Sequence, residues 1–376
     1  MTTASFAPAT ASAPGLVPRA MMLAFVAALV FAVALLAGPR SGLVLLIGLG
    51  FGLTLEGFNF GFTGPWRGMI LERDASGLLA QLLAIAIIAC AALPLLAANG
   101  AELKGAHAPI GLAMIGGAFV FGAAMQIVLG CGSGTLVNAG SGNAIGAVAL
   151  PFFAIGSFAG AYHLSWWTAL GSLPVVALEG AGGLGITLLG LAGIAALALM
   201  LGRRGSHRLP ARYWGALLAL AALGILHLVV AGQPWGVVYG LGLWVAKGVV
   251  AVGGDLSGSV FWSAPGNAAQ VEASLLTDIT SLTDLGLIGG AALVAWWRAG
   301  LGSPVGILPA RAWVAVIVAG LVLGYSSRLA FGCNIGAFFS GIATGSAHGW
   351  VWFVAAFAGS WAGIRLRPRL GLEARR

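Results

Sequence analysis

The stretch VFGAAMQIVLGCGSG, residues 120–134, occurs a second time in altered form as VLGYSSRLAFGCNIG, residues 322–336. The two stretches superimpose when the chain is shifted by 202 residues, and both contain a glycine-cysteine pair. After one further inserted residue, GSFAG (156–160) falls on GSWAG (359–363). Self-similarity at a fixed spacing is the signature of repeated structural units, so the chain is predicted to contain two copies of one fold.

The composition places these copies in a membrane. Hydrophobic residues make up 60% of the 376 residues and charged residues only 7%, and the mean hydropathy is +1.01. A soluble surface needs roughly a quarter or more charged residues, so an all-α integral membrane protein is predicted. The formal net charge is +8, but most Lys and Arg lie in short connectors, where they set topology rather than bind nucleic acid.

A spanning helix needs about 20 predominantly apolar residues. Nine segments meet this requirement: 20–38, 78–98, 110–128, 145–162, 184–202, 212–231, 285–300, 312–329 and 348–365. Four further apolar stretches are interrupted by glycine: 42–66, 129–144, 236–262 and 331–347. Irregular backbone at membrane depth needs protein or water to satisfy its amides, so we predict four re-entrant hairpins around a shared cavity. The alternative is that the glycines simply let helices pack closely.

The repeat defines the organisation of the chain. We predict a first inverted repeat over 20–165, a linking segment with a central helix over 166–205, and a second repeat over 206–365. This gives a 4+1+4 plan with two hairpins per half. Because five crossings separate the copies, they are predicted to be inverted relative to each other. Residues 1–19 are predicted to be an outside tail rather than a signal peptide, because no basic residue lies close to the first residue, and 366–376 a basic cytoplasmic tail.

The distribution of basic residues tests this topology. The predicted inside set is Arg40, Arg67, Arg73, Arg203, Arg204, Arg208, Arg212, Arg298, Arg311, Arg365, Arg367, Arg369, Arg375 and Arg376. The residues left outside or within the membrane are Arg19, Lys104, Lys247 and Arg328. The bias predicts an outside N-terminus and a cytoplasmic C-terminus in the inner, cytoplasmic membrane.

Two of the three cysteines, Cys131 and Cys333, occupy matched repeat positions. Glycines leave amides free and let backbone approach a ligand closely, so the site is predicted to contain the two cysteines with Gly130, Gly132, Gly134, Gly332, Asn334 and Gly336. A neutral thiol is a weak donor and a polarizable acceptor, which suits an anion that presents sulfur. The alternative is that each cysteine is a small packing residue, which is the interpretation favoured for Cys90 inside its apolar helix.

Four charged or titratable residues are secondary candidates. Glu56 and Lys247 each precede a glycine in the first hairpin of their half, and they are predicted either to pair as a clasp or to flank a path. Arg328 aligns with Gln126 and either attracts an anion or extends to the headgroups. His348 is interpreted as a satisfied polar contact in preference to a proton relay. Asp255 is interpreted as a solvated loop carboxylate.

The paired GCGSG and GCNIG motifs, the GSFAG and GSWAG helices and the inverted plan resemble the YeeE/YedE family of thiosulfate transporters (TsuA-like) over about residues 20–365. The resemblance implies import of thiosulfate along cysteines on re-entrant segments, with Cys131 and Cys333 as two of them. It also implies a small cytoplasmic sulfur-carrier partner of the TusA type. The family tends to carry a further cysteine on the first hairpin, where this chain reads EGFNFGFTGPWRG (56–68).

No motif predicts an enzyme: the chain has no phosphate loop, no zinc-ligand spacing and no nucleophile arrangement, so neither a cofactor nor a metal is expected. The predicted function is import of thiosulfate or a related sulfur-containing anion. The alternatives are a membrane-embedded sulfur relay, with sulfur transfer at a cysteine, and a sensor or accessory subunit of a sulfur-metabolism system.

Overall fold

The computed structural model describes residues 14–298 and 308–373. In these ranges the chain is helical apart from loops and two isolated bridges, which confirms the all-α prediction. The helices of the first part are α1 (Leu16–Ala37), α2 (Pro39–Gly57), α3 (Thr63–Glu72), α4 (Ser76–Ala98), α5 (Leu112–Val128), α6 (Gly132–Gly140), α7 (Ala144–Tyr162), α8 (Leu164–Thr168) and α9 (Gly180–Leu201). Those of the second part are α10 (Ala211–Ala231), α11 (Val238–Ala251), α12 (Pro265–Glu272), η1 (Leu275–Thr277), α13 (Ile279–Arg298), α14 (Ala310–Leu329), η2 (Asn334–Phe339), α15 (Ser340–Ala343) and α16 (His348–Leu366).

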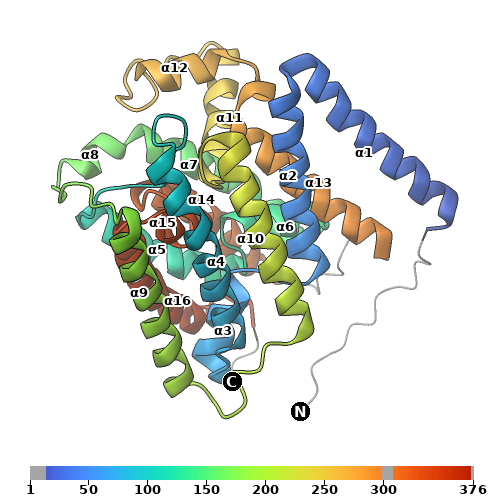
Figure 1. The fold of residues 1–376 in the computed structure, drawn as a ribbon. Helices are drawn as coiled ribbons and strands as arrows, with labels where there is room; N and C mark the ends of the chain where they lie inside the picture. The colour runs from blue at the N-terminus through green and yellow to red at the C-terminus, as the bar shows by residue number, and fades with distance from the viewer. Residues whose placement is uncertain (1–13, 299–307, 374–376) are drawn as a thin grey trace.

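Nine helices of the described chain are long and apolar enough to cross a membrane. One of them is α2, which differs from the hairpin predicted over 42–66. Its glycines pack against other helices: β-carbons at Gly48 and Gly52 would lie 2.6 and 2.2 Å from carbonyl oxygens of α13, and Figure 1 shows α2 beside α13. Here the alternative of close helix packing is correct. The helix α16, predicted as a span over 348–365, is not among the nine and includes a histidine and an arginine.

The repeat stretches have matching backbone conformations. Leu129 and Phe331, the residues that end α5 and α14, both adopt a left-handed conformation, with φ of 53° and 55°. Gly142 and Gly345 adopt φ of 81° and 80° before α7 and α16. A short helical segment lies between the two turns in each copy, α6 in the first and η2 with α15 in the second. The orientation of the copies relative to a membrane stays a prediction.

Matched glycines allow the long helices of the two copies to cross at close range. A β-carbon at Gly156 of α7 would lie 2.1 Å from Leu321 O of α14, and one at Gly359 of α16 would lie 1.9 Å from Phe119 O of α5. These two contacts join the GSFAG and GSWAG helices to the helix before the cysteine turn of the other copy. Close approach of this kind is typical of small-residue helix interfaces in membranes.

The ends of the bundle differ in charge, and two arginines lie at the end opposite to the one predicted. Arg19 donates to Trp297 O, beside Arg298, although the two arginines were assigned to opposite sides. Arg40 donates to carbonyls at the end of α10, 2.8 and 2.7 Å away, whereas Arg212 lies at the beginning of this helix. The assignment of Arg40 to the same side as Arg212, and of Arg19 to the side opposite Arg298, is therefore wrong, whereas the side of the membrane on which the N-terminus lies stays a prediction. The reason is that α2 crosses the bundle as a full helix.

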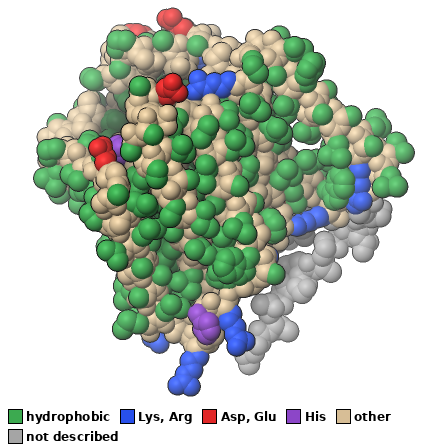
Figure 2. Space-filling model, viewed as in Figure 1, with side chains coloured by type: hydrophobic (Ala, Val, Ile, Leu, Met, Phe, Trp, Pro, Cys, Tyr) green, Lys and Arg blue, Asp and Glu red, His purple; other side chains and the backbone are tan. Residues whose placement is uncertain are grey.

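The lateral surface is apolar. Figure 2 shows hydrophobic side chains over most of the visible face, with charged side chains mainly at its margins. Large hydrophobic side chains of α1 and α9, such as Leu36 and Met200, are more than three quarters exposed. A surface of this kind fits lipid rather than water, in agreement with a multi-pass membrane protein.

Candidate functional site

Both cysteines cap the short segment that follows the turn. Cys131 O accepts from Thr135 N and Cys333 O accepts from Ala337 N, each at 2.9 Å. The glycine before each cysteine donates back into the preceding helix: Gly130 N to Met125 O at 3.1 Å and Gly332 N to Ser327 O at 2.9 Å. Each thiol is therefore held at the beginning of a helical segment, next to backbone amides that have no partner one turn earlier.

The structure brings the two cysteine turns together. A β-carbon at Gly132 would lie 2.7 Å from Cys333 Sγ, and one at Gly134 would lie 3.6 Å from Cys131 Sγ. Both cysteines are free and buried, with exposures of 0% and 1%. The Cys333 thiol can therefore approach the Cys131 turn only because residue 132 is a glycine. Gly336 in the other turn is not crowded, since a β-carbon there would have no atom within 4 Å.

A cavity of about 670 Å³ reaches Cys333 but not Cys131. We call it the Cys333 cavity, and its charged, titratable and cysteine-turn residues include Lys104, His107, Asp278, Arg328, Cys333 and Gly336. Lys104 lies at the same end of the bundle as Arg40, because its amide donates to Gly232 O just after α10. The cavity therefore opens away from the arginine-rich end and narrows to a thiol.

Arg328 provides a partly buried positive charge in this cavity. Its guanidinium lies 4.6 Å from the ring centre of Phe261 and 5.8 Å from that of Tyr239. It takes part in none of the three ion pairs of the described residues, and its Nε has no hydrogen-bond partner. A guanidinium over aromatic faces is stabilised by cation–π attraction, and its N–H groups remain available to donate to an anion. Of the two predicted roles, this placement fits attraction of an anion.

Several buried polar atoms around the two thiols lack a partner among the described residues. They are Thr63 Oγ1, Gln126 Oε1, Trp235 Nε1 and both polar side-chain atoms of Asn334. Gln126 is tied to the turn before α3 by Nε2, which donates to Thr63 O at 3.4 Å, and the Thr63 hydroxyl lies near Cys131. Buried polar groups in native proteins are nearly always satisfied, so this cluster is suited to a polar ligand or water.

Aromatic side chains close the other side of the thiols. Phe62 packs edge-on against Phe339 at 5.4 Å, and Trp66 against Phe338 at 5.6 Å. All four side chains are buried. Beyond them, a smaller cavity of about 250 Å³ lies between α3 and the beginning of α4, near Glu72 and Asp74 at the arginine-rich end. The smaller cavity shares no lining residue with the Cys333 cavity.

The predicted clasp between Glu56 and Lys247 is wrong. Lys247 Nζ instead donates to carbonyls at the end of α12, including Gln270 O at 2.6 Å and Val271 O at 2.8 Å. Glu56 lies near the end of α2, where Arg298 donates to its carbonyl at 3.4 Å. The two residues belong to opposite ends of the bundle, because α2 and α11 run in opposite directions. Neither lines the Cys333 cavity.

The remaining candidates lie away from the thiols. His348 is buried and bonds Ser346 Oγ through Nδ1 at 2.5 Å, while its Nε2 has no partner among the described residues. Asp255 bonds Ser257 N at 2.9 Å in an exposed loop, as interpreted from the sequence. Cys90 is exposed on α4, so its interpretation as a buried packing residue is wrong. The sequence interpretation missed Thr63 and Asp284; a carboxylate inside an apolar helix is the signal that points to Asp284.

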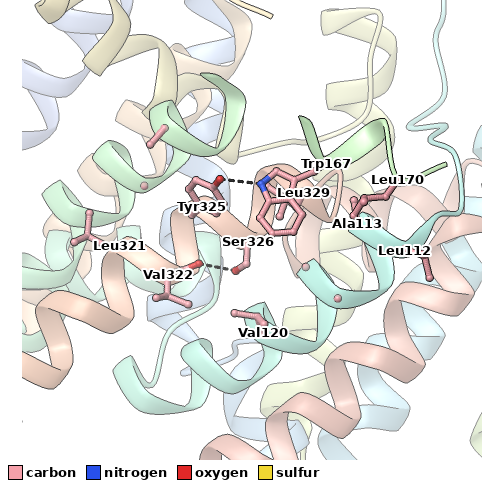
Figure 3. Close-up of a pocket in the computed structure, with 14 residues that line it drawn as sticks. Leu112, Ala113, Val120, Trp167, Leu170, Leu321, Val322, Tyr325, Ser326 and Leu329 are labelled. Atoms are coloured by element: carbon pink, nitrogen blue, oxygen red, sulfur yellow. Dashed lines mark hydrogen bonds between the residues drawn. The ribbon is translucent and has the colours of Figure 1, made fainter. Parts of the chain in front are cut away.

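A second, apolar groove lies on the flank of the bundle. It measures about 560 Å³, is lined mainly by α5, α7 and α14, and shares no lining residue with the Cys333 cavity. Figure 3 shows Tyr325 and Trp167 on one side of it, joined by a hydrogen bond of 2.8 Å from Trp167 Nε1 to Tyr325 Oη. Its lining contains no charged group, so it does not fit an anion site.

Comparison with known proteins adds independent information. The profile of a family described as sulphur transport matches residues 59–362. The chain is 29% identical over 165 residues to the probable transporter YedE of Escherichia coli K12, covering 42% of this chain and 39% of the relative. It is also 29% identical over 160 residues to the probable transporter YedE of Salmonella typhimurium LT2, covering 41% and 38%. The match thus spans less than half the length of these curated relatives.

Proposed function

The chain belongs to the sulphur transport family, and we propose that it is a membrane transporter, not an enzyme, that imports thiosulfate or a related sulfur-containing anion. The observation that carries this proposal is the Cys333 cavity, which contains an unpaired arginine and ends at a thiol adjacent to the turn of a second thiol. The profile match and the transporter relatives support it.

The chemistry of the cavity suits a sulfur-containing anion. Arg328 supplies charge and up to five donors, so an anion entering the cavity is attracted before it reaches Cys333. A neutral thiol can donate to an oxyanion through S–H and contacts a polarizable sulfur atom through its own sulfur. Because the Cys333 thiol lies against Gly132, next to Cys131, the anion passes from Cys333 to Cys131 and then meets the unpartnered Thr63 hydroxyl.

The aromatic cluster of Phe62, Trp66, Phe338 and Phe339 is the barrier that separates Cys131 from the arginine-rich end. Transport requires that this barrier opens while the Cys333 cavity closes. The matched cysteine turns provide the moving parts, because each is a short segment held between long helices that cross through glycine contacts.

The arginine-rich end is proposed to face the cytoplasm across the inner membrane, in accordance with the positive-inside rule. The proposed import direction then runs from the Cys333 cavity outside to the cytoplasmic side. A small cytoplasmic sulfur carrier of the TusA type is a proposed partner at that end. The alternative function, a sulfur relay, is favoured by the proximity of two free cysteine turns. Mass spectrometry of the thiols after exposure to thiosulfate separates the two. A relay breaks the S–S bond of thiosulfate, releases sulfite and leaves the outer sulfur on a cysteine as a persulfide, whereas non-covalent passage leaves the thiol unchanged.

The proposal is tested by uptake of radiolabelled thiosulfate into vesicles. We expect Cys131→Ala and Cys333→Ala to lose uptake, and sulfate, sulfite and selenium analogues to compete with different strengths. Cys90→Ala is the matched control, because Cys90 lies on the outer face of α4 and should leave uptake unchanged. Normal uptake by either of the first two variants, produced at wild-type levels, would refute a path along both cysteines.

A further inference from the structure

Asp284 is a completely buried acid that the proposed path does not use. It lies on α13, is 0% exposed, and has no hydrogen-bond partner on either Oδ1 or Oδ2 among the described residues. It takes part in none of the ion pairs found there. An isolated ionised carboxylate is very unfavourable in a low-dielectric interior, and ionisable residues in membrane helices commonly mark ion or proton pathways.

The carboxyl group lies directly behind the wall of the Cys333 cavity. Thr280, one helical turn earlier on the same face of α13, lines the cavity. On the other side, a β-carbon at Gly240 of α11 would lie 2.9 Å from Asp284 Oδ2, and the neighbouring Tyr239 lines the cavity. Cys333 lines the same cavity as Thr280 and Tyr239. The acid is therefore placed beside the position where the anion first meets a cysteine.

The first copy of the repeat shows that the fold does not require an acid here. Helices α4 and α13 each precede the helix that leads to a cysteine turn, and Gln81 lies five residues after the first residue of α4, as Asp284 does after that of α13. The Gln81 side chain is satisfied: Oε1 accepts from Trp66 Nε1 and Nε2 donates to Gly61 O, each at 3.0 Å. A neutral amide thus serves the structural role at the matched position, whereas Asp284 stays unpartnered.

No basic side chain neutralises Asp284. The nearest titratable or charged groups come from each neighbouring element. They are Asp278 before α13, Tyr239 and Lys247 on α11, Cys131 before α6, Cys333 before η2, His227 on α10, Arg328 on α14, and Arg40 and Glu56 near the two ends of α2. His227 bonds Thr283 Oγ1 at 3.0 Å and not Asp284. Lys247 is held by the carbonyls at the end of α12.

We propose that Asp284 is a proton-binding site that couples passage of the anion to passage of a proton. This inference rests on the proposed function. An anion beside Cys333 and an ionised Asp284 repel each other in a medium of low dielectric constant, so the anion binds when a proton from the Cys333 cavity has converted the carboxylate to a carboxylic acid. The same proton leaves the carboxyl oxygen after the anion has moved on. No bond other than O–H changes, and a dianion with one proton carries a single net negative charge.

The coupling is measured with the full-length protein in proteoliposomes that contain a pH-sensitive dye. For the wild type we expect thiosulfate entry to acidify the lumen, and uptake to decrease as the external pH is raised and Asp284 loses its proton. In Asp284→Asn, which is permanently neutral, we expect uptake to persist while acidification and pH dependence are lost. The control is Asp255→Asn, a carboxyl group in an exposed loop that does not line the cavity, which should retain acidification. Acidification by Asp284→Asn at the wild-type proton-to-anion ratio would overturn the proposal.

If Asp284→Asn does not fold, the measurement on the wild type alone still tests the coupling of proton and anion movement. Thiosulfate uptake by the wild type without acidification of the lumen would overturn the coupling and leave the proposed function intact. Absence of any thiosulfate uptake by folded wild-type protein would refute the proposed function, and the coupling with it. Asp284→Gln, which copies Gln81, provides a second neutral variant and should behave like Asp284→Asn.

Discussion

The two copies of the repeat share their scaffold but differ in charge. Leu129 and Phe331 end the helices before the cysteine turns with nearly the same φ, and the two cysteines cap the following segments in the same way. Around the turns, however, the first copy has the neutral Gln126 where the second has Arg328. In α4, the neutral Gln81 lies as far from the first residue of the helix as Asp284 does in α13. The two turns are thus similar in backbone, and in the proposed mechanism the difference in charge makes only the second one the entrance.

The largest effect on stability is expected where the scaffold is the same in both copies. Gly359→Ala would place a methyl group 1.9 Å from Phe119 O, and Gly156→Ala would place one 2.1 Å from Leu321 O. Since backbone must move in both cases, each variant should lose about 1–3 kcal/mol of stability, as overpacked cores do. Thermal unfolding in detergent, followed by gel filtration, measures the loss.

Gly116→Ala is the matched control on α5, because a β-carbon there has nothing within 4 Å. The comparison of the copies predicts similar losses for Gly156 and Gly359. A large loss for one and none for the other would show that the two helix crossings are not equivalent.

The next largest effect, on the concentration dependence of uptake, is expected at a position where the copies differ. Arg328→Gln gives the second copy the side chain of the first and removes the partly buried positive charge from the Cys333 cavity. We expect the half-saturating thiosulfate concentration to rise about tenfold, which corresponds to about 1.4 kcal/mol. Concentration-dependent uptake in vesicles measures this change.

Arg328→Lys keeps the charge but not the planar set of donors, so it should lie between the wild type and Arg328→Gln. An unchanged half-saturating concentration in folded Arg328→Gln would contradict the role of Arg328 in attracting the anion.

The smallest effect is expected at the beginning of α4, away from the Cys333 cavity. Asp74 Oδ1 accepts from Ser76 N at 3.0 Å at the beginning of α4, as Asp278 Oδ2 accepts from Ser281 N at 2.7 Å in α13. Partial burial raises the pKa of Asp74, but hydrogen bonds from Ser76 and the charge of Arg203 outweigh this and hold the pKa below its ordinary value. A lowered pKa stabilises the folded state at pH values above the unfolded pKa, and this contribution is lost as the pH falls through the folded pKa.

Asp74→Asn should therefore reduce the free energy of unfolding at neutral pH by less than about 1 kcal/mol, as is usual for solvent-screened groups. The difference from the wild type should shrink as the pH falls below about 4, the ordinary pKa of aspartate, and vanish once the pH is below the lowered folded pKa. Stability measured across this pH range in detergent checks the expectation. A difference that grows on acidification would contradict the assigned sign.

Periodicity and self-similarity were sufficient to predict most of the fold. Apolar length located most of the long helices, and the matched glycine-cysteine pairs indicated two turns that the structure brings together. What failed was the interpretation of glycine in α2: a glycine that breaks a helix and one that lets a helix approach its neighbour look alike in sequence. Only the contact of Gly48 and Gly52 with α13 separates the two cases.

The composition of the site was less predictable because it depends on contacts between distant segments. Nothing near Thr63 in the sequence indicates that its hydroxyl lies close to Cys131, which is far along the chain. Likewise Lys247 and Glu56 precede glycines in similar contexts, yet lie at opposite ends of the bundle. Charge in an apolar helix signals function, but the partner of that charge is decided by tertiary packing.

The central claim is that the anion enters at the second copy and meets Cys333 before Cys131. The most direct measurement is the rate of modification of each cysteine by a small membrane-impermeant thiol reagent in sealed, uniformly oriented vesicles, resolved by mass spectrometry with and without thiosulfate. The account predicts that Cys333 reacts from the side of its cavity, that Cys131 reacts far more slowly, and that thiosulfate protects Cys333. Equal reaction of the two cysteines, or no protection of Cys333 by thiosulfate, would contradict it.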